Sequence, residues 1–177
     1  MQAPAQPPSP PEPAVNGSIN DARALRKSLS QFATGVTVIT TRTPEGTLVG
    51  LTANSFGALS LEPALIVWSL RLSSSSLAIF QNAPRFVVNV LTDAQVETSR
   101  HFASSAPKKF ESVAHAENQH GLPLLHGSAA WFECCLVSHQ IAGDHCLFIA
   151  EVERFSSSEA SPLLFHAGGY FTLGSRL

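Results

Sequence analysis

Residues 129–155 read AAWFECCLVSHQIAGDHCLFIAEVERF, and this stretch decides the fold class. Two long apolar runs, 129–141 and 145–155, are separated only by Ala142-Gly143-Asp144, which is typical of a hairpin turn. Long hairpins leave unpaired strand edges unless the sheet closes on itself or is covered. The stretch therefore predicts a small antiparallel β-barrel.

Shorter β-rich runs flank this hairpin on both sides. We expect strands over 36–42, 47–53, 64–70 and 86–91 before it, and over 163–166 and 170–173 after it. The turn Thr43-Pro44-Glu45-Gly46 joins the first two as a hairpin. Residues 107–127 show no regular pattern and are expected to be irregular. The chain is thus predicted to be mainly β with flanking helices.

Helical signals occur at two places, and a third, shorter helix is expected within 73–82. Asn20 or Asp21 is a good N-cap for a helix whose apolar face carries Ala22, Leu25, Leu29 and Phe32, with Gly35 as its end. A second helix begins at Thr92, which forms a capping box with Gln95, and runs to about Ala103.

Composition predicts one domain of ordinary size, over residues 19–177. The chain has 177 residues, of which 44% are hydrophobic and 14% charged, and a net charge of -2. So few charges favour a large core and burial against a partner subunit, and they argue against binding to nucleic acid or to a membrane. Residues 1–18 hold half of the twelve prolines, so we expect a disordered tail there.

Cysteine usage and the N-terminal sequence favour a cytoplasmic protein. Cys134, Cys135 and Cys146 fall in apolar runs without CxxC spacing, which is typical of reduced core thiols. The N-terminus lacks the features of a signal peptide, and no apolar run approaches the ~20 residues of a membrane span.

Several common catalytic motifs are missing from the sequence. It contains no GxGxxG, no GxxxxGK[ST], no GxSxG and no HExxH, and its seven histidines are not grouped with carboxylates. A Rossmann dinucleotide site, a P-loop and a metal site are therefore not expected.

Two polar stretches are candidates for ligand contacts. Gly50-Leu51-Thr52-Ala53-Asn54-Ser55-Phe56 joins small side chains to neutral hydrogen-bonding groups, either to receive a flat ligand or simply as a strand entering a loop. Ser73-Ser74-Ser75-Ser76 after Arg71 is either a phosphate cradle or a flexible loop with a helix cap.

Three polar residues in strands are ambiguous. Asn89 either satisfies backbone groups internally or faces a ligand, and Glu133 either lies on a polar face or pairs across the sheet. His145, directly after the Gly143-Asp144 turn, is either incidental to the turn or stands at the edge of a cleft where a cofactor binds.

Five motifs together resemble one family, the flavin reductase-like proteins that serve as reductase components of two-component flavin monooxygenases. In order, they are Phe32-Ala33-Thr34-Gly35-Val36, the 50–56 stretch, Ser74-Ser75-Ser76-Leu77, Phe86-Val87-Val88-Asn89-Val90-Leu91 and Gly143-Asp144-His145. The resemblance runs from about Leu25 to Tyr170 and implies an FMN-binding split β-barrel, antiparallel and Greek-key-like, that forms a homodimer.

The resemblance also implies which residues contact the cofactors. Thr52, Ala53, Asn54 and Ser55 would line the isoalloxazine ring, Ser69, Leu70, Ser74 and Ser76 would hold the ribityl-phosphate end, and Phe86 and Asn89 would lie near the flavin tail. His145 would be the catalytic residue beside the nicotinamide, and Tyr170 would close the same pocket.

The expected activity is that of an NAD(P)H:flavin oxidoreductase, with FMN or FAD as flavin and NADH, or alternatively NADPH, as hydride donor. It would supply reduced flavin by diffusion to a partner monooxygenase. Two alternatives stay open: a split-barrel flavoprotein with tightly bound flavin that reduces a corrin or a ferric chelate, and a non-enzymatic flavin-binding protein.

Overall fold

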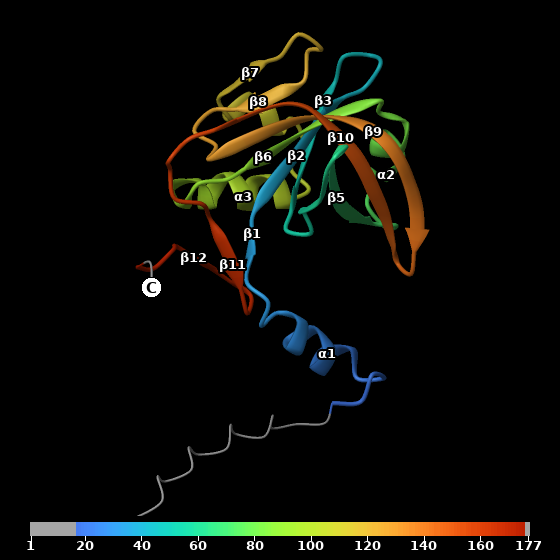
Figure 1. Ribbon diagram of the computed structural model, residues 1–177, viewed down its shortest axis with the longest axis vertical. Helices are drawn as coiled ribbons and strands as arrows, with labels where there is room; N and C mark the ends of the chain where they lie inside the picture. The colour runs from blue at the N-terminus through green and yellow to red at the C-terminus, as the bar shows by residue number, and fades with distance from the viewer. Residues whose placement is uncertain (1–16, 176–177) are drawn as a thin grey trace, which may run out of the picture.

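The computed structural model describes residues 17–175 and centres on a seven-stranded antiparallel sheet in the order β3-β2-β6-β9-β10-β5-β4 (Figure 1). The strands are β2 (Thr37–Arg42), β3 (Leu48–Ala53), β4 (Gly57–Leu61), β5 (Ala64–Arg71), β6 (Arg85–Val90), β9 (Ala130–Ala142) and β10 (His145–Ser157). The mainly β, antiparallel prediction is confirmed.

The β9–β10 hairpin forms as its sequence predicts. Gly143 takes a φ of 62° in the turn, a conformation that glycine adopts without strain, and His145 pairs directly with Ala142. The register shifts between Ile149 and Ala150 and again between Val152 and Arg154. Such irregularities bend and twist a strand, so the hairpin curves around the core.

A side chain joins the two ends of the curved sheet. Ser55 Oγ, just beyond β3, accepts a hydrogen bond from the Ser69 N–H and donates one to the Ser69 carbonyl oxygen on β5, both at 3.0 Å. These bonds join strands from opposite ends of the sheet order. The result is the small barrel that the sequence predicts, with a partly open side.

Aromatic side chains fill the barrel. Trp68 on β5 stacks on Phe148 of β10 with ring centroids 4.4 Å apart, and Phe80 and Phe86 meet Trp68 edge-on. All four side chains are fully buried. A second cluster under the helix that follows β6 includes Val38, Leu91, Phe102 and Leu163.

The helices are α1 (Ala22–Leu29), α2 (Leu77–Asn82) and α3 (Val96–Ala103), with short 3-10 helices η1 (Asp93–Gln95) and η2 (Lys109–Ser112). Asp21 caps α1 and the Thr92–Gln95 capping box forms, as predicted. The prediction that Gly35 ends the first helix is wrong. Ser30 is its C-cap, and the next N–H groups, those of Gln31 and Phe32, bond carbonyls three residues back instead of four and so end the α-helix.

The two strands expected after the long hairpin form as β11 (Leu164–His166) and β12 (Gly169–Phe171), and they make a small sheet with β1 (Thr34–Gly35). Three short strands were absent from the sequence prediction: β1, and β7 (His115–Glu117) with β8 (Pro123–Leu125), which form a hairpin inside the 107–127 segment expected to be irregular. Two or three residues are too few to show a period of two. β4 was also missed, since a register shift between Ala58 and Ser60 interrupts its alternation.

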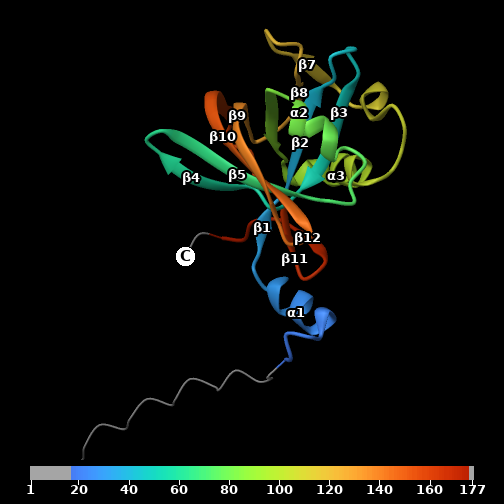
Figure 2. The same ribbon diagram turned by 90° about the vertical axis from the view of Figure 1, so that its right-hand side faces the viewer.

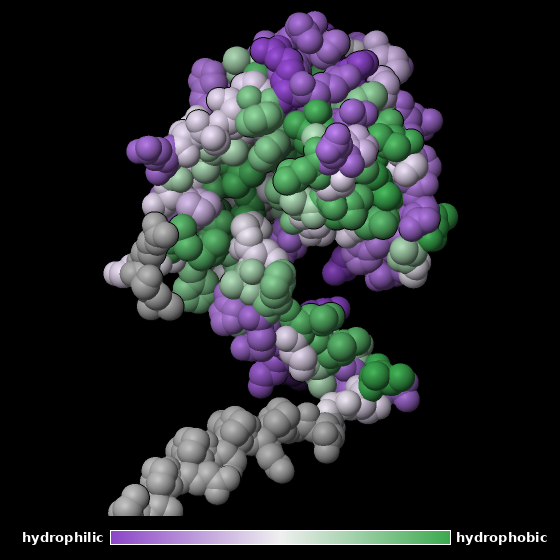
Figure 3. Space-filling model, viewed as in Figure 1, coloured by the Kyte–Doolittle hydropathy of each residue, from purple (hydrophilic) through white to green (hydrophobic). Residues whose placement is uncertain are grey.

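The α1 helix projects from the barrel (Figure 2). None of its residues is buried, and its apolar side chains face solvent. Figure 3 shows apolar surface both on this arm and on the barrel above it. Most of the predicted tail, residues 1–16, lies outside the described residues. Within 17–175, no helix is long and apolar enough to cross a membrane.

Candidate functional site

A pocket of about 590 Å³ lies where β3, β5, the serine loop before α2 and the end of α3 come together. It brings together nine of the twelve predicted site residues: Thr52, Ala53, Asn54, Ser55, Ser69, Leu70, Ser74, Ser76 and His145. These residues come from four segments spread over more than ninety positions of the chain. The barrel closure between β3 and β5 therefore assembles the pocket.

The β3 wall of the pocket is small, flat and fixed by hydrogen bonds. Thr52 Oγ1 donates to the Ser99 carbonyl oxygen at 2.6 Å, and Asn54 Nδ2 donates to Thr34 Oγ1 at 3.3 Å. Ser55 is held by its two bonds to Ser69. Small side chains locked in this way leave a preorganised surface that a planar ligand can approach closely.

The serine loop supplies hydroxyl groups to the pocket. Ser73, Ser74, Ser75 and Ser76 all line the pocket. Ser76 stands at the N-cap of α2 without a side-chain hydrogen bond to the helix, while Ser74 Oγ accepts from the Ser76 N–H at 3.3 Å. Helix starts with free N–H groups and hydroxyls favour a phosphate.

Two cationic side chains line the same pocket, Arg71 and Lys109. Lys109 Nζ donates to the Phe102 carbonyl oxygen at 2.9 Å and to that of Gly50 at 3.5 Å, and burial lowers the pKa of its ammonium. A smaller cavity of about 250 Å³ shares Lys109, Ser75 and Ser76 with the pocket. Lys109 thus stands where the two spaces meet.

Lys109 was not predicted as a site residue, and Arg71 was noted only beside the serine run. Arg71 could have been included, because it directly precedes the serines. Lys109 carries no such local signal: it opens a 3-10 helix in a segment without periodicity, and only the fold carries it to β3.

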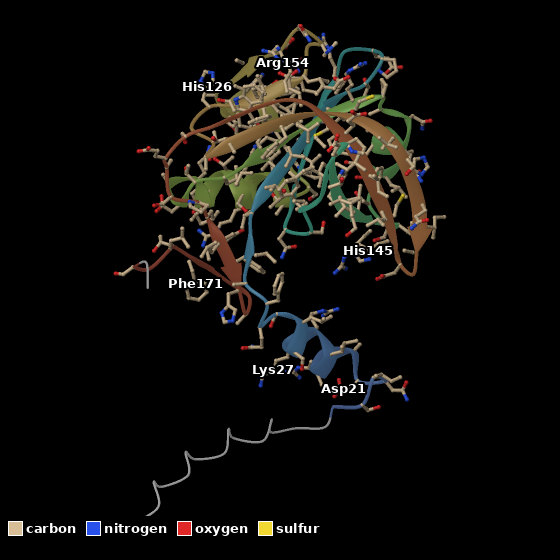
Figure 4. All side chains as sticks on the ribbon, viewed as in Figure 1. Asp21, Lys27, His126, His145, Arg154 and Phe171 are labelled. Atoms are coloured by element: carbon tan, nitrogen blue, oxygen red, sulfur yellow. The ribbon has the colours of Figure 1, made fainter. Side chains whose placement is uncertain are left out.

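His145 stands at the mouth of the pocket, at the start of β10 and opposite Arg71 of β5 in register. Its Nδ1 lies 2.7 Å from Asp144 Oδ1, and this hydrogen bond lowers the pKa of the Asp144 carboxyl. The contact orients the ring, and Nε2 is then the ring nitrogen left for a ligand. Figure 4 shows His145 at the end of the β9–β10 hairpin.

Three predicted residues are not brought to the pocket. Phe86 is fully buried in the barrel core. Asn89 is also fully buried. Its Nδ2 donates to the Val38 carbonyl oxygen and to Thr40 Oγ1, and its Oδ1 accepts from the Leu125 N–H. Asn89 therefore satisfies groups inside the protein, which is one of the two roles that the sequence left open.

Tyr170 on β12 does not line the pocket, but it contacts Ser99, which contacts the pocket residue Thr52. Its hydroxyl is 2.8 Å from Ser99 Oγ, and Ser99 in turn bonds Thr52 through its carbonyl oxygen. Tyr170 therefore supports the β3 wall rather than lining the pocket.

Glu133 takes a structural position. It is buried on β9, with Oε1 3.7 Å from Arg154 Nη1 of β10, which is the pairing across the sheet that the sequence left open. Within residues 17–175 no group of three or more His, Cys, Asp or Glu side chains is arranged to hold a metal ion.

The model of one protein family, the flavin reductase like domain, matches residues 29–174 of the chain. The reductase component of a flavin-dependent trigonelline monooxygenase from Acinetobacter baylyi is 39% identical over 155 residues, which cover 88% of this chain and 50% of the relative. An FMN reductase (NADH), SmoA, from Agrobacterium fabrum is 37% identical over 150 residues and 85% of each chain.

Solved structures show the same similarity. The Streptomyces globisporus NADH:FAD oxidoreductase SgcE6, in complex with NAD and FAD fragments, superposes with a TM-score of 0.86 at 30% identity, over 91% of this chain and 98% of that one. The chain spans about half the length of the first curated relatives it matches, from Acinetobacter baylyi and Rhizobium meliloti.

Proposed function

Because the chain belongs to the flavin reductase like family, we propose that it is an NAD(P)H-dependent flavin reductase that transfers hydride from the nicotinamide to FMN or FAD. The reduced flavin then serves a partner monooxygenase. The observation that carries the proposal is one pocket. It combines a flat polar wall, a serine loop with two cationic side chains beside it, and a histidine at its mouth.

A flavin fits the chemistry of this pocket. Leu51, Leu70 and Phe102 supply apolar surface for a ring system, and the 52–55 segment supplies neutral polar groups at its edge. The volume of about 590 Å³ lies in the range of small-molecule sites. The flavin accepts hydride when bound and carries the chemistry of the reaction.

The basic end of the pocket suits the ribityl phosphate. The hydroxyls of Ser74 and Ser76 and the cations Arg71 and Lys109 face the same space. Charge-assisted hydrogen bonds to a phosphate are about twice as strong as neutral ones. These residues fix one end of the flavin, and its orientation in the pocket follows from that anchor.

In this reaction the protein has to position the nicotinamide ring against the flavin ring. Hydride transfer needs no general base from the chain, but it needs the donor and acceptor at near-attack distance. His145, oriented by Asp144 at the mouth, contacts the nicotinamide in this proposal and excludes water from its side of the pocket. Backbone N–H groups of the 53–55 segment would stabilise negative charge that develops on a bound flavin.

We also propose a homodimer and a cytoplasmic location. An isolated helix of eight residues is unstable in water, yet α1 buries none of its residues in this chain. Leu25, Leu29 and Phe32 are exposed by 45%, 66% and 78%, and a second copy would cover them. The three cysteines are free thiols, which suits a reducing compartment.

The test is NADH oxidation by the purified protein with FMN, with FAD, or with no flavin added, repeated with NADPH. We expect oxidation that requires added flavin and saturates with it. Oxidation without added flavin indicates a bound prosthetic group and supports the alternative flavoprotein that reduces a corrin or a ferric chelate. No oxidation of either nucleotide, with flavin still bound, contradicts the reductase and leaves a flavin-binding protein.

A further inference from the structure

A second cavity, of about 600 Å³, shares no lining residue with the candidate flavin pocket. It lies between the β2–β3 turn, α2, the start of β6 and the loop that precedes β8. These segments meet at the end of the barrel away from α1 (Figure 1). Nothing in the reductase proposal uses this cavity.

The cavity has an apolar floor. Leu122 and Ala83 are each only 5% exposed, and Ile79 of α2 is half-buried beside them, with Pro84 completing the surface. An apolar floor beneath a cavity of this size favours a ligand with an apolar body.

Arg42 lies at the rim, where its guanidinium passes close to the backbone of two glycine turns. A Cβ at Gly121 would come within 2.4 Å of its Nη1, and one at Gly46 within 3.1 Å of its Nη2. Its ion pair with Glu117 is a single contact of 3.3 Å between two exposed side chains. Such pairs contribute little, so an incoming anion can compete for this guanidinium at small cost.

Arg85 supplies the second guanidinium. Its Nε and Nη2 donate to the two carboxylate oxygens of Glu153, both at 2.9 Å, and this pair lowers the pKa of Glu153. Nη1 has no acceptor within residues 17–175. The bidentate pair fixes the guanidinium and leaves one edge for a further acceptor.

The remaining titratable groups at the rim are Glu45 and His120. Glu45 is exposed on the β2–β3 turn, where hydrogen bonding from Thr43 lowers the pKa of its carboxyl. The cavity therefore has an apolar floor with Arg42, Arg85 and Glu45 at its solvent edge, and each arginine also faces a carboxylate outside the lining, Glu117 or Glu153.

We propose that this cavity binds a small carboxylate with an apolar, ring-sized body. The ring would rest on Leu122, Ala83 and Ile79, while the carboxylate would accept hydrogen bonds from Arg42 and Arg85. The inference stands on the cavity and its donors alone and does not depend on flavin reduction.

Calorimetric titration with benzoate tests the proposal, with the protein saturated with FMN so that the other pocket is filled. We expect saturable binding of benzoate, and at least tenfold weaker binding of the uncharged benzamide and of the cationic benzylamine. Arg42→Gln and Arg85→Gln should each weaken benzoate binding about tenfold. Arg23→Gln, which makes the same change on α1, should leave it unchanged.

Arg42→Gln keeps the test decisive if Arg85→Gln unfolds the protein, because the Arg42 ion pair is exposed. Benzoate that fails to saturate, or that binds Arg42→Gln as tightly as the parent protein, overturns the proposal. Equal binding of benzylamine also overturns it. Benzoate binding that occurs only without FMN assigns the ligand to the flavin pocket and overturns it as well.

Discussion

Thr52 and Ser55 line the candidate flavin pocket and also hold the barrel together. Their hydroxyls are committed to backbone groups of Ser99 and Ser69 in other elements. The sequence predicted these positions as ligand contacts because they are small and polar. The structure adds that the same hydroxyls fix the wall, so the ligand meets their oxygens and the backbone beside them on a rigid surface.

Replacing His145 by alanine should raise KM for NADH and lower kcat, with the flavin Kd nearly unchanged. The reason is that His145 stands at the mouth, away from the serine loop that anchors the flavin. Steady-state kinetics and flavin fluorescence titration measure the two effects separately. His126→Ala, at a distant exposed site (Figure 4), is the matched control; unchanged NADH parameters in His145→Ala would contradict the role.

Replacing Lys109 by methionine should weaken flavin binding about tenfold, because a charge-assisted hydrogen bond to an anion contributes about 1.5–3 kcal/mol. Fluorescence titration with FMN and with riboflavin, which lacks the phosphate, checks the cause. The loss should be large for FMN and small for riboflavin. Lys27→Met on α1 is the control, and an equal loss for both flavins would indicate a steric effect rather than a lost phosphate contact.

At the scale of elements, α3 packs on β3 through a glycine. A Cβ at Gly50 would lie 2.7 Å from the buried ring of Phe102. The Gly50 carbonyl also accepts a hydrogen bond from Lys109. The close approach of helix to strand thus sets the packing beneath the pocket, and the Gly50 carbonyl helps to position its half-buried cation.

Gly50→Ala should destabilise the fold by about 1–3 kcal/mol, since a well-packed core resists an added methyl group. Thermal and urea unfolding measure the change. Gly35→Ala, also in a strand but with no atom within 4 Å of the added Cβ, should change stability by less than about 0.5 kcal/mol. Equal stability of the two variants would show that the α3–β3 contact relaxes freely.

At the scale of the whole molecule, one part of the chain lacks a place to bury its apolar face. The α1 arm extends from the barrel with Leu25, Leu29 and Phe32 exposed (Figures 2 and 3). The chain is 44% hydrophobic and 14% charged, so little charge is available to keep such a surface solvated. A second copy of the chain is the partner that we propose for it.

Leu29→Glu should shift the protein from dimer toward monomer at micromolar concentration, because a buried carboxylate without a partner is costly at an interface. Light scattering after gel filtration measures the mass directly. Lys27→Gln changes the net charge by the same amount on the opposite face of α1 and should leave the dimer intact. A parent protein that is already monomeric would rule out the dimer.

Local sequence by itself determined the elements whose signals are complete within a few residues. The β9–β10 hairpin follows from two long apolar runs around Gly143, and the helix starts follow from Asp21 and from the Thr92–Gln95 box. It also marked most of the pocket residues, because small polar side chains after a strand and a serine run are unusual in a core. Each of these features depends on neighbours in the chain.

Tertiary structure decided what depends on residues distant in the chain. Asn89 looked like a ligand contact by its motif, but backbone groups of Val38 and Leu125 satisfy it in the core. Lys109 carried no local signal, and it lies in the pocket because its ammonium bonds the carbonyls of Gly50 on β3 and Phe102 on α3. Burial and hydrogen bonding between separate segments set these roles, and neither can be read from the order of residues alone.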